Sequence, residues 1–278
     1  MNHNEKKKIW QEMGSYLTAV FIGVIVMIPF LWMLSTSFKS KGALMQIPVQ
    51  WIPKEPSLDA YRTVFSRFPL LRAIGNSFLI TGSYTVVTIL SASMAAFAIT
   101  KIKFPWAESI FKLYLASMMI PTQVTLIPLF VIMNKLGLIN TYPSVILPSL
   151  FRAFAVFMLV QQMRSIPNDF MEAARIDGAG IFRIYGRVIM PLTRSAIATL
   201  TVTTFMESWN DYLWPLLMLS DKNKMTLTLA LNSLNGQYGT EYNLLMAGSL
   251  ISMVPIIIIY ACAQRYFKSG LMSGGVKG

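Results

Sequence analysis

The sequence predicts an all-α, polytopic membrane protein with six transmembrane helices and a cytoplasmic helical segment between two of them. Hydrophobic residues make up 54% of the 278 residues and charged residues only 13%, whereas soluble domains carry about 25% charged residues. Several long runs contain no charged residue. Each exceeds the roughly 20 residues that a helix needs to cross the hydrocarbon core; the runs are 13–38, 73–100, 113–134 and 242–264.

Two more apolar stretches contain charged residues. Arg152 interrupts residues 142–163, and Glu207 and Asp211 interrupt residues 197–219. Both stretches still reach membrane-spanning length. They bring the expected number of transmembrane helices to six.

The first apolar run follows Lys6, Lys7 and Lys8 close to the N-terminus. It is too long for the apolar core of a signal peptide, and no small-residue cleavage site follows it. We therefore expect it to be retained as a transmembrane helix.

The basic residues predict the orientation of the spans. With six spans, both termini lie on the same side of the membrane. The segments on that side carry 14 Lys and Arg, and the segments on the other side carry 9. By the positive-inside rule the richer set is cytoplasmic; it comprises residues 1–14, 101–112, 164–194 and 265–278. The net charge of +12 then favours contact with anionic lipid headgroups rather than with nucleic acid.

The first outer loop, residues 40–68, is rich in proline, which argues against a long helix there. Within it, Leu58, Tyr61 and Phe65 follow Ser57 at helical spacing, so a short interfacial helix is expected. Trp32 and Trp51 flank the outer boundary of the first span, as residues of an aromatic belt do. Further prolines fall inside the spans, where each predicts a kink that is either functional or merely tolerated: Pro29, Pro121, Pro128, Pro148, Pro215 and Pro255.

A polar, basic interruption separates the fourth and fifth predicted spans, from Ile166 to Pro191. Pro167 and Asn168 should end the fourth span. Asp169 is expected to cap a new helix, with Glu172 three residues later completing a capping box.

This helix should be short, because Gly178 and Gly180 follow two turns after its start and glycine readily adopts the left-handed conformation at a helix end. Ala173 and Ala174 are small enough to let another surface approach closely. A second helical stretch, residues 182–190, should lead into the fifth span. Charged residues surround the small face: Glu172, Arg175 and Asp177.

The order of residues in this interruption is E-A-A-x3-G-x9-V-x-M-P. It resembles the EAA loop of the membrane subunits of ABC importers, with Val188 and Met190 in place of the usual Ile and Leu. The alternative is an ordinary surface loop with helix caps, which explains neither this order nor the length. In that family the loop is a cytoplasmic coupling helix that contacts an ATP-hydrolysing subunit. The resemblance therefore implies coupling roles for Glu172, Ala173, Ala174, Asp177, Gly178, Gly180 and Pro191.

The resemblance extends to other segments, namely M119-I-P-T-Q-V-T-L-I-P-L-F130, L136-G-L-I-N-T-Y142, W209-N-D-Y-L-W-P215 and the tail Q264-R-Y-F-K-S-G-L-M-S-G-G-V-K-G278. Together they resemble the second permease subunit of carbohydrate ABC importers of the maltose type. In that family the C-terminal tail reaches into the interface between two ATPase subunits. This implies an ATPase contact for Gly274, Gly275, Val276, Lys277 and Gly278, although Lys277 is alternatively a plain terminal charge.

The resemblance also implies partners: a homologous second permease subunit, two copies of an ATPase subunit, an extracellular or periplasmic solute-binding protein, and membrane lipid. The location implied is a bacterial or archaeal inner membrane, with both termini cytoplasmic.

The sequence contains no G-x4-G-K-[ST] loop for phosphate binding and no Cys/His cluster for a metal, and its one histidine is His3. We therefore expect a transporter subunit that is not itself an enzyme and needs no cofactor, with ATP and Mg bound by the partner ATPase.

Three regions are expected along the chain. Residues 1–70 would form the N-terminal tail, first transmembrane helix and outer loop. Residues 71–265 would form the permease core, with the coupling loop at 165–191. Residues 266–278 would form a cytoplasmic C-terminal tail.

Ionisable groups within spans are candidates for the translocation path. Glu207 and Asp211 are four residues apart and share one helix face; with Asn210 and Arg152 they are the candidate path residues. Alternatively, the two acids anchor a helix end at the headgroups or pair with Arg152.

Other functions remain open on the sequence alone. The nearest is an ABC permease for another solute class, such as glycerol phosphate or an amino acid, and the Gly-Val-Lys-Gly ending argues against it. A second is an ion-coupled secondary transporter, which should show inverted repeats; none is visible. A membrane enzyme should show paired acids or a histidine deep in the bundle.

Overall fold

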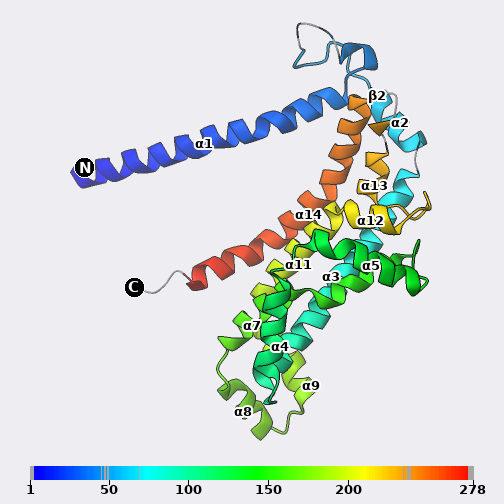
Figure 1. Ribbon diagram of the computed structural model, residues 1–278. Helices are drawn as coiled ribbons and strands as arrows, with labels where there is room; N and C mark the ends of the chain where they lie inside the picture. Colours follow the sequence, from blue (N-terminus) through cyan, green and yellow to red (C-terminus); the bar gives the residue numbers. More distant parts are fainter. Residues whose placement is uncertain are drawn as a thin grey trace. The chain divides into compact units, whose positions relative to one another are not determined.

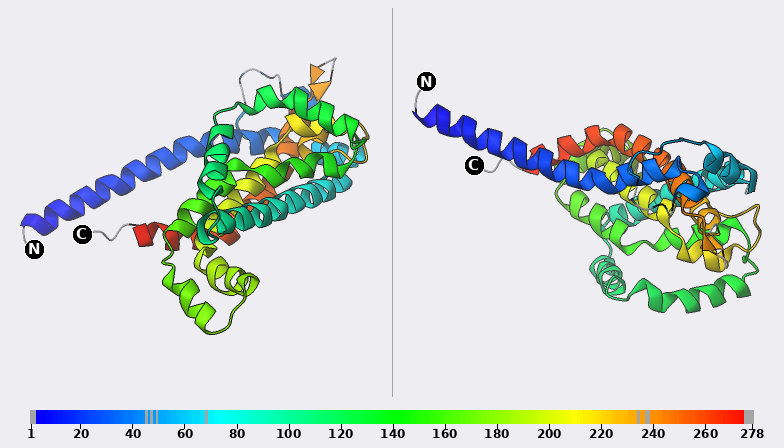
Figure 2. Two further views of the ribbon diagram at one scale, coloured as in Figure 1. Left: turned by 60° about the horizontal axis from the view of Figure 1, so that its bottom comes forward. Right: turned by 90° about the horizontal axis from the view of Figure 1, so that it is seen from above.

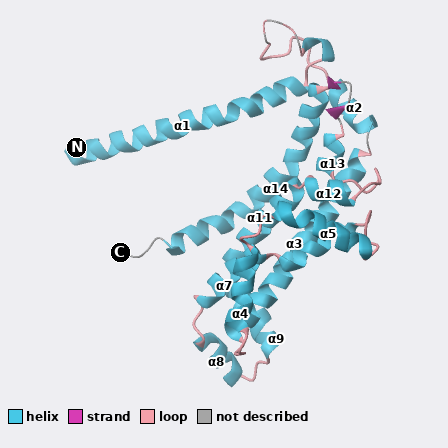
Figure 3. Cartoon of the chain, in the orientation of Figure 1, coloured by secondary structure: helices cyan, strands magenta, loops and turns pink. Residues whose placement is uncertain are grey.

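The computed structural model describes residues 3–44, 46, 48, 50–67, 69–233, 235–236 and 239–274. Most of the described chain is helical, with connecting loops and one short antiparallel pair of strands, β1 (Asn235–Gly236) and β2 (Gly239–Thr240) (Figure 3). The chain forms two compact units. The first comprises Met1–Phe68 and Leu231–Met253, and the second Pro69–Ala230 and Val254–Gly278.

In the first unit, α1 (His3–Ser37) is a 35-residue helix (Figure 1). Every side chain from residue 13 to residue 31 is exposed, and large apolar residues such as Tyr16 and Phe21 point outward on all faces. A helix that is apolar all round requires an apolar surrounding. Residues 13–37 are accordingly long and apolar enough to cross a membrane.

The outer loop contains η1 (Lys41–Ala43) and α2 (Asp59–Arg67). The expected short helix is confirmed, and the Ser57 hydroxyl accepts a hydrogen bond from the Asp59 N–H at 3.0 Å. The buried residues of α2 are Ala60 and Val64, whereas Phe65, and Leu58 directly before the helix, are exposed. Sequence spacing thus found the helix but not the face that it buries.

The aromatic pair at the end of α1 lies in contact. Trp32 and Trp51 meet edge to face with ring centroids 5.1 Å apart, and the ammonium of Lys39 lies 4.0 Å from the centroid of the Trp32 ring. Burial lowers the pKa of Lys39. A carbon added at Gly248, in α14 (Tyr242–Gly274), would lie 2.3 Å from the end of the Leu231 side chain, so Leu231 would have to shift to admit a larger residue there.

The second unit is built around α3 (Leu70–Lys101), which packs against α7 (Ala153–Arg164) and α11 (Arg194–Asn210). Small residues on α3, among them Ala92, Ser93 and Ala96, are almost completely buried. Small side chains at a contact let helix backbones approach closely, which is how membrane helices gain packing energy without a hydrophobic driving force.

The predicted third span, 113–134, is not one continuous helix. It consists of α4 (Ala107–Ser117) and α5 (Thr122–Lys135), which meet at an angle of 105° (Figure 2, right). Pro121 lies at the break, where it lacks the N–H that would continue the α4 hydrogen-bond ladder.

The fourth predicted span, 142–163, is also interrupted. It comprises α6 (Tyr142–Ile146), the 3₁₀ turn η2 (Leu147–Phe151) and α7. Arg152 connects η2 to α7 in an extended conformation, with ψ 97°. This span still satisfies the length and composition of a membrane-crossing segment, as do Leu70–Lys101 and Tyr242–Cys262.

A bent helical segment leads into the fifth predicted span. The chain passes through α8 (Asp169–Ile176), α9 (Ile181–Ile184), the π-helical turn η3 (Tyr185–Ile189) and α10 (Met190–Leu192), bends by 78°, and enters α11. It then ends in α12 (Leu213–Met218), before α13 (Leu227–Asn232). In the described residues, four helices are long and apolar enough to cross a membrane, or up to six if each bent pair is one span.

Candidate functional site

The segment from α8 to α9 lies at one end of the helices α3, α4 and α7 (Figures 1 and 2). It does not belong to an uninterrupted apolar span. Met171 is 3% exposed and joins the main hydrophobic core of the second unit, and Ala174 packs against the same core. One face of α8 therefore packs against the bundle, and the opposite face is exposed.

The expected capping box at the start of α8 is wrong. Asp169 is the first helical residue, the N-cap is Asn168, and no side chain caps the helix. Asn168 has the helical conformation φ −70°, ψ −20° rather than the extended one that is typical of an N-cap. Its Oδ1 accepts a hydrogen bond from Lys101 Nζ at 3.2 Å, and Lys101 lies 67 positions away in the sequence.

The expected left-handed end of α8 is confirmed at Gly178, whose φ is +76°. The Gly178 N–H donates to the Arg175 carbonyl at 3.0 Å, and the Ala179 N–H donates to the Ala174 carbonyl at 2.9 Å. These two bonds form a Schellman motif, which satisfies carbonyl groups that a helix end leaves free. Gly180 then precedes α9 with φ −70° and ψ 164°, an extended conformation that any residue can adopt.

The exposed face of α8 carries apolar residues that sequence reasoning missed. Beside the exposed Ala173 lie Phe170, with 49% of its surface exposed, and Ile176, with 87% exposed; Phe182 on α9 is 82% exposed. Large apolar side chains gathered outside the membrane-spanning segments indicate an interaction surface. Their spacing of three along α8 was the available signal, because Phe170, Ala173 and Ile176 share one helix face.

The remaining residues of the predicted coupling set are also exposed: Glu172, Asp177, Gly178, Gly180 and Pro191. Pro191 lies in α10, 13 residues beyond Gly178 and next to the bend that leads into α11. The structure therefore brings Glu172, Ala173 and Asp177 together on α8, and separates Pro191 from them.

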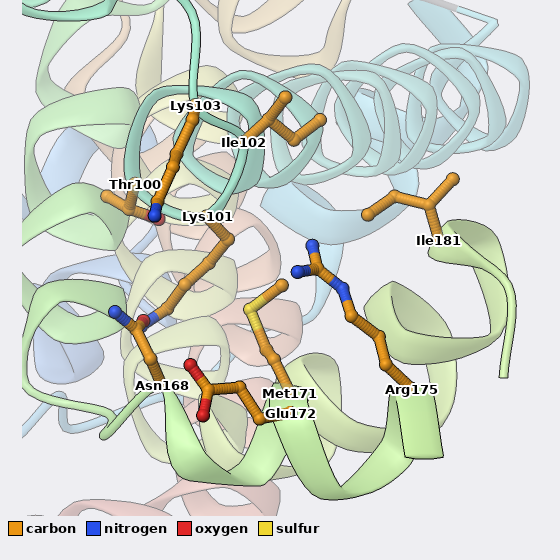
Figure 4. Close-up of a pocket in the computed structure, with 9 residues that line it drawn as sticks. All are labelled: Thr100, Lys101, Ile102, Lys103, Asn168, Met171, Glu172, Arg175 and Ile181. Atoms are coloured by element: carbon orange, nitrogen blue, oxygen red, sulfur yellow. The ribbon is translucent and has the colours of Figure 1, made fainter. Parts of the chain in front are cut away.

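A pocket of about 360 Å³ lies between the end of α3 and α8 (Figure 4). Figure 4 shows Glu172 and Arg175 rising from α8 toward the end of α3, with the Lys101 side chain directed at Asn168. The pocket is lined by Thr100, Lys101, Ile102, Lys103, Asn168, Met171, Glu172, Arg175 and Ile181.

The candidate path residues form a second polar cluster within the spans. Arg152, at the break between η2 and α7, forms an ion pair with Glu207 of α11 and lies with its Cζ 5.9 Å from the centroid of the Tyr84 ring. The pairing considered as an alternative role for Glu207 is thus present. Asp211 instead accepts a hydrogen bond from the Trp214 N–H at 3.3 Å, at the start of α12.

Three exposed polar residues follow one another on the face of α11 that carries Glu207. These are Thr203, Glu207 and Asn210, at intervals of four and three residues. The Asn210 amide nitrogen donates to the Met206 carbonyl at 2.8 Å. Hydrocarbon does not solvate such a face, so it must meet water or another protein surface.

The tail residues fall largely outside the described part of the chain. Gly274 ends α14, and Gly275, Val276, Lys277 and Gly278 lie beyond the described residues. Among the residues that the structure describes, no three His, Cys, Asp or Glu side chains come together as a metal-binding group.

The long apolar helices, the broken spans and the polar cluster within the spans define a polytopic helical membrane protein of the transporter type. Residues 85–272 match the family described as "Binding-protein-dependent transport system inner membrane component". The chain belongs to this family of ABC transporter permease subunits.

The transport proteins that this chain resembles are named for different solutes. The chain is 36% identical to the arabinooligosaccharides transport system permease protein AraQ of Halalkalibacterium halodurans, over 93% of this chain and 94% of the relative. It is 30% identical to the sn-glycerol-3-phosphate transport system permease protein UgpE of Brucella abortus, over 90% and 92%. A solved bacterial ABC transporter involved in alginate import contains a chain of the same fold, with TM-score 0.81 and 23% identity over 96% and 99%.

Proposed function

We propose that this chain forms half of the translocation path of an ATP-driven importer for a sugar or oligosaccharide, and that α8 couples it to an ATPase subunit. The observation that carries the coupling role is the exposed apolar face of α8, made by Phe170, Ala173 and Ile176. The small Ala173 lets another surface approach, and the two large side chains offer area that would be buried on contact. The match of the segment to the E-A-A-x3-G pattern supports the same role.

The path is proposed to run along the exposed polar face of α11. Thr203, Glu207 and Asn210 offer hydroxyl, carboxylate and amide groups, which hydrogen-bond to hydroxyl-rich solutes. Arg152 neutralises part of the negative charge. Discontinuous helices that carry polar groups are typical of solute sites in transporters.

One chain supplies one coupling helix, whereas two ATPase copies need two. We therefore propose a complex of this subunit, a homologous permease and two ATPase copies, served by an external solute-binding protein. In this complex, each bent helix pair counts as one span and gives six spans. The proposed regions are residues 1–70, 71–265 and 266–278, and the tail residues from Gly274 onward would contact the ATPase pair.

The proposed orientation can be tested by thiol labelling. In a chain whose single cysteine is replaced (Cys262→Ser), a cysteine at Ser165 should react with membrane-impermeant reagents only from the cytoplasmic side, because the basic segment 164–194 is held there. A cysteine at Asn235 should react only from outside. Reaction of both from the same side would contradict the six-span arrangement.

The proposed function is tested by reconstitution in liposomes with candidate partner subunits. Uptake and ATP hydrolysis should require the second permease, the ATPase and one binding protein, and should respond to one oligosaccharide. Because one similar permease carries the name of sn-glycerol 3-phosphate transport, that solute is included as a competitor. Stimulation by sn-glycerol 3-phosphate alone would overturn the sugar assignment, and uptake by this chain without partners would overturn the importer model.

A further inference from the structure

Lys101 is a buried cation at the junction between the membrane-spanning bundle and α8. It is the last residue of α3 and is 8% exposed. Its ammonium donates to the Ile166 carbonyl at 2.6 Å and to Asn168 Oδ1 at 3.2 Å. A buried lysine needs such acceptors, because an ammonium without partners is costly to remove from water.

These two hydrogen bonds connect three elements. Ile166 follows the end of α7, and Asn168 is the N-cap of α8. Lys101 therefore ties the end of α3 to both the end of α7 and the start of α8 (Figure 4).

The other attachments of α8 are few. The short connection of residues 165–168 joins it to α7, Met171 is inserted into the core, and the chain turns at Gly178 in a left-handed conformation immediately after it. The outward face is apolar, and the described part of the chain shows no partner that would hold this face in register with α3. Only the ammonium of Lys101 links the start of α8 to α3 by hydrogen bonds in the described contacts.

We infer that Lys101 is a positioning residue that makes α8 move together with α3 and α7, so that force applied to α8 reaches the translocation path. This inference rests on the proposed contact between α8 and the ATPase. We call the two hydrogen bonds of the Lys101 ammonium the latch. The latch holds the start of α8 in a fixed position, so that α8 cannot tilt independently of the bundle.

The test replaces the ammonium but keeps most of the side-chain length, as in Lys101→Met. It is measured in the reconstituted complex with both permeases and the ATPase. The ATPase should still associate and hydrolyse ATP, because the exposed face of α8 is unchanged. The amount of solute imported per ATP hydrolysed should fall at least tenfold. An unchanged import-to-hydrolysis ratio would overturn the inference.

A matched control is provided by a neighbouring cation. Arg164, at the end of α7, pairs with Glu108 of α4 at 2.9 Å and does so at an exposed position. Arg164→Gln also removes a cation from this junction but touches no part of α8, so the import-to-hydrolysis ratio should stay within twofold of the original. A loss equal to that of Lys101→Met would show a general requirement for positive charge and would overturn the specific role of Lys101.

Chemical rescue adds a second readout. In a Cys262→Ser background, Lys101→Cys should be uncoupled, and alkylation with 2-bromoethylamine should restore an ammonium at nearly the original position and recover the import-to-hydrolysis ratio.

If the Lys101 variants do not assemble, the reaction rate of a Met171→Cys thiol is measured in membranes that contain this chain alone. Loss of the latch should raise that rate at least tenfold, and an unchanged rate would overturn the inference.

Failure of this inference differs from failure of the proposed function. If Lys101→Met leaves coupling intact while changes at Gly178 disrupt ATPase association, the latch is wrong and the coupling role of α8 stands. If changes at neither position affect ATPase association or import, α8 is not the ATPase contact.

Discussion

Gly178→Val is expected to abolish solute uptake and to weaken association with the ATPase. Gly178 has φ +76°, a conformation that costs an L-residue about 1–2 kcal/mol and a β-branched residue more. No atom lies within 4 Å of a carbon added at Gly178, so the effect comes from backbone strain rather than from a clash. Relief of the strain would break the Schellman bonds to Ala174 and Arg175 and displace the end of α8. Uptake in liposomes and co-purification of the ATPase measure both effects.

Two controls separate this effect from loss of stability. Gly178→Asn should retain most uptake, because asparagine tolerates the left-handed region better than other residues. Gly137 has φ +69° and an equally open surrounding, but lies after α5. Gly137→Val introduces similar strain outside the coupling segment and should leave ATPase association unchanged. Equal loss of ATPase association in Gly137→Val and Gly178→Val would contradict the coupling role of α8.

Glu207→Gln is expected to lower uptake at least tenfold while the complex still assembles. The substitution removes the carboxylate charge that pairs with Arg152 and leaves the positive charge of Arg152 less compensated within the spans, which is unfavourable in a membrane. It also changes the charge of the proposed path face. Uptake, ATP hydrolysis and the yield of assembled complex are measured in the same preparation.

The exchange Arg152→Glu with Glu207→Arg distinguishes pairing from path chemistry. If the pair only stabilises the bundle, the exchanged variant should recover assembly and uptake together. If Glu207 faces the solute, assembly should recover but uptake should not. Glu108→Gln serves as control, because the exposed pair of Glu108 with Arg164 should contribute at most about 1 kcal/mol. An uptake equal to that of the unmodified chain in Glu207→Gln would remove Glu207 from the path.

The proposed coupling segment, residues 165–191, shows which structural features a local sequence pattern can predict. The E-A-A-x3-G order located α8, and glycine at residue 178 predicted the left-handed end, because both depend on residues within two turns of each other. The same local reasoning placed a cap at Asp169 and was wrong. The helix begins at Asp169 itself, so Asp169 lies inside α8 and not at its N-cap. The side chain of the residue that does precede the helix, Asn168, bonds to Lys101 over 67 residues, and such a contact has no trace in a local pattern.

The sequence by itself determined the membrane class, the position of the proposed coupling segment and the short helix α2 between the first two spans. Hydrophobic composition, uncharged runs and glycine are properties of contiguous residues, and the bilayer acts on them directly. Only the tertiary structure decided the pairing of Arg152 with Glu207 and the exposure of Phe170, Ile176 and Phe182. Each of these depends on which distant segments pack together, since packing decides which face of a helix is covered and which remains free.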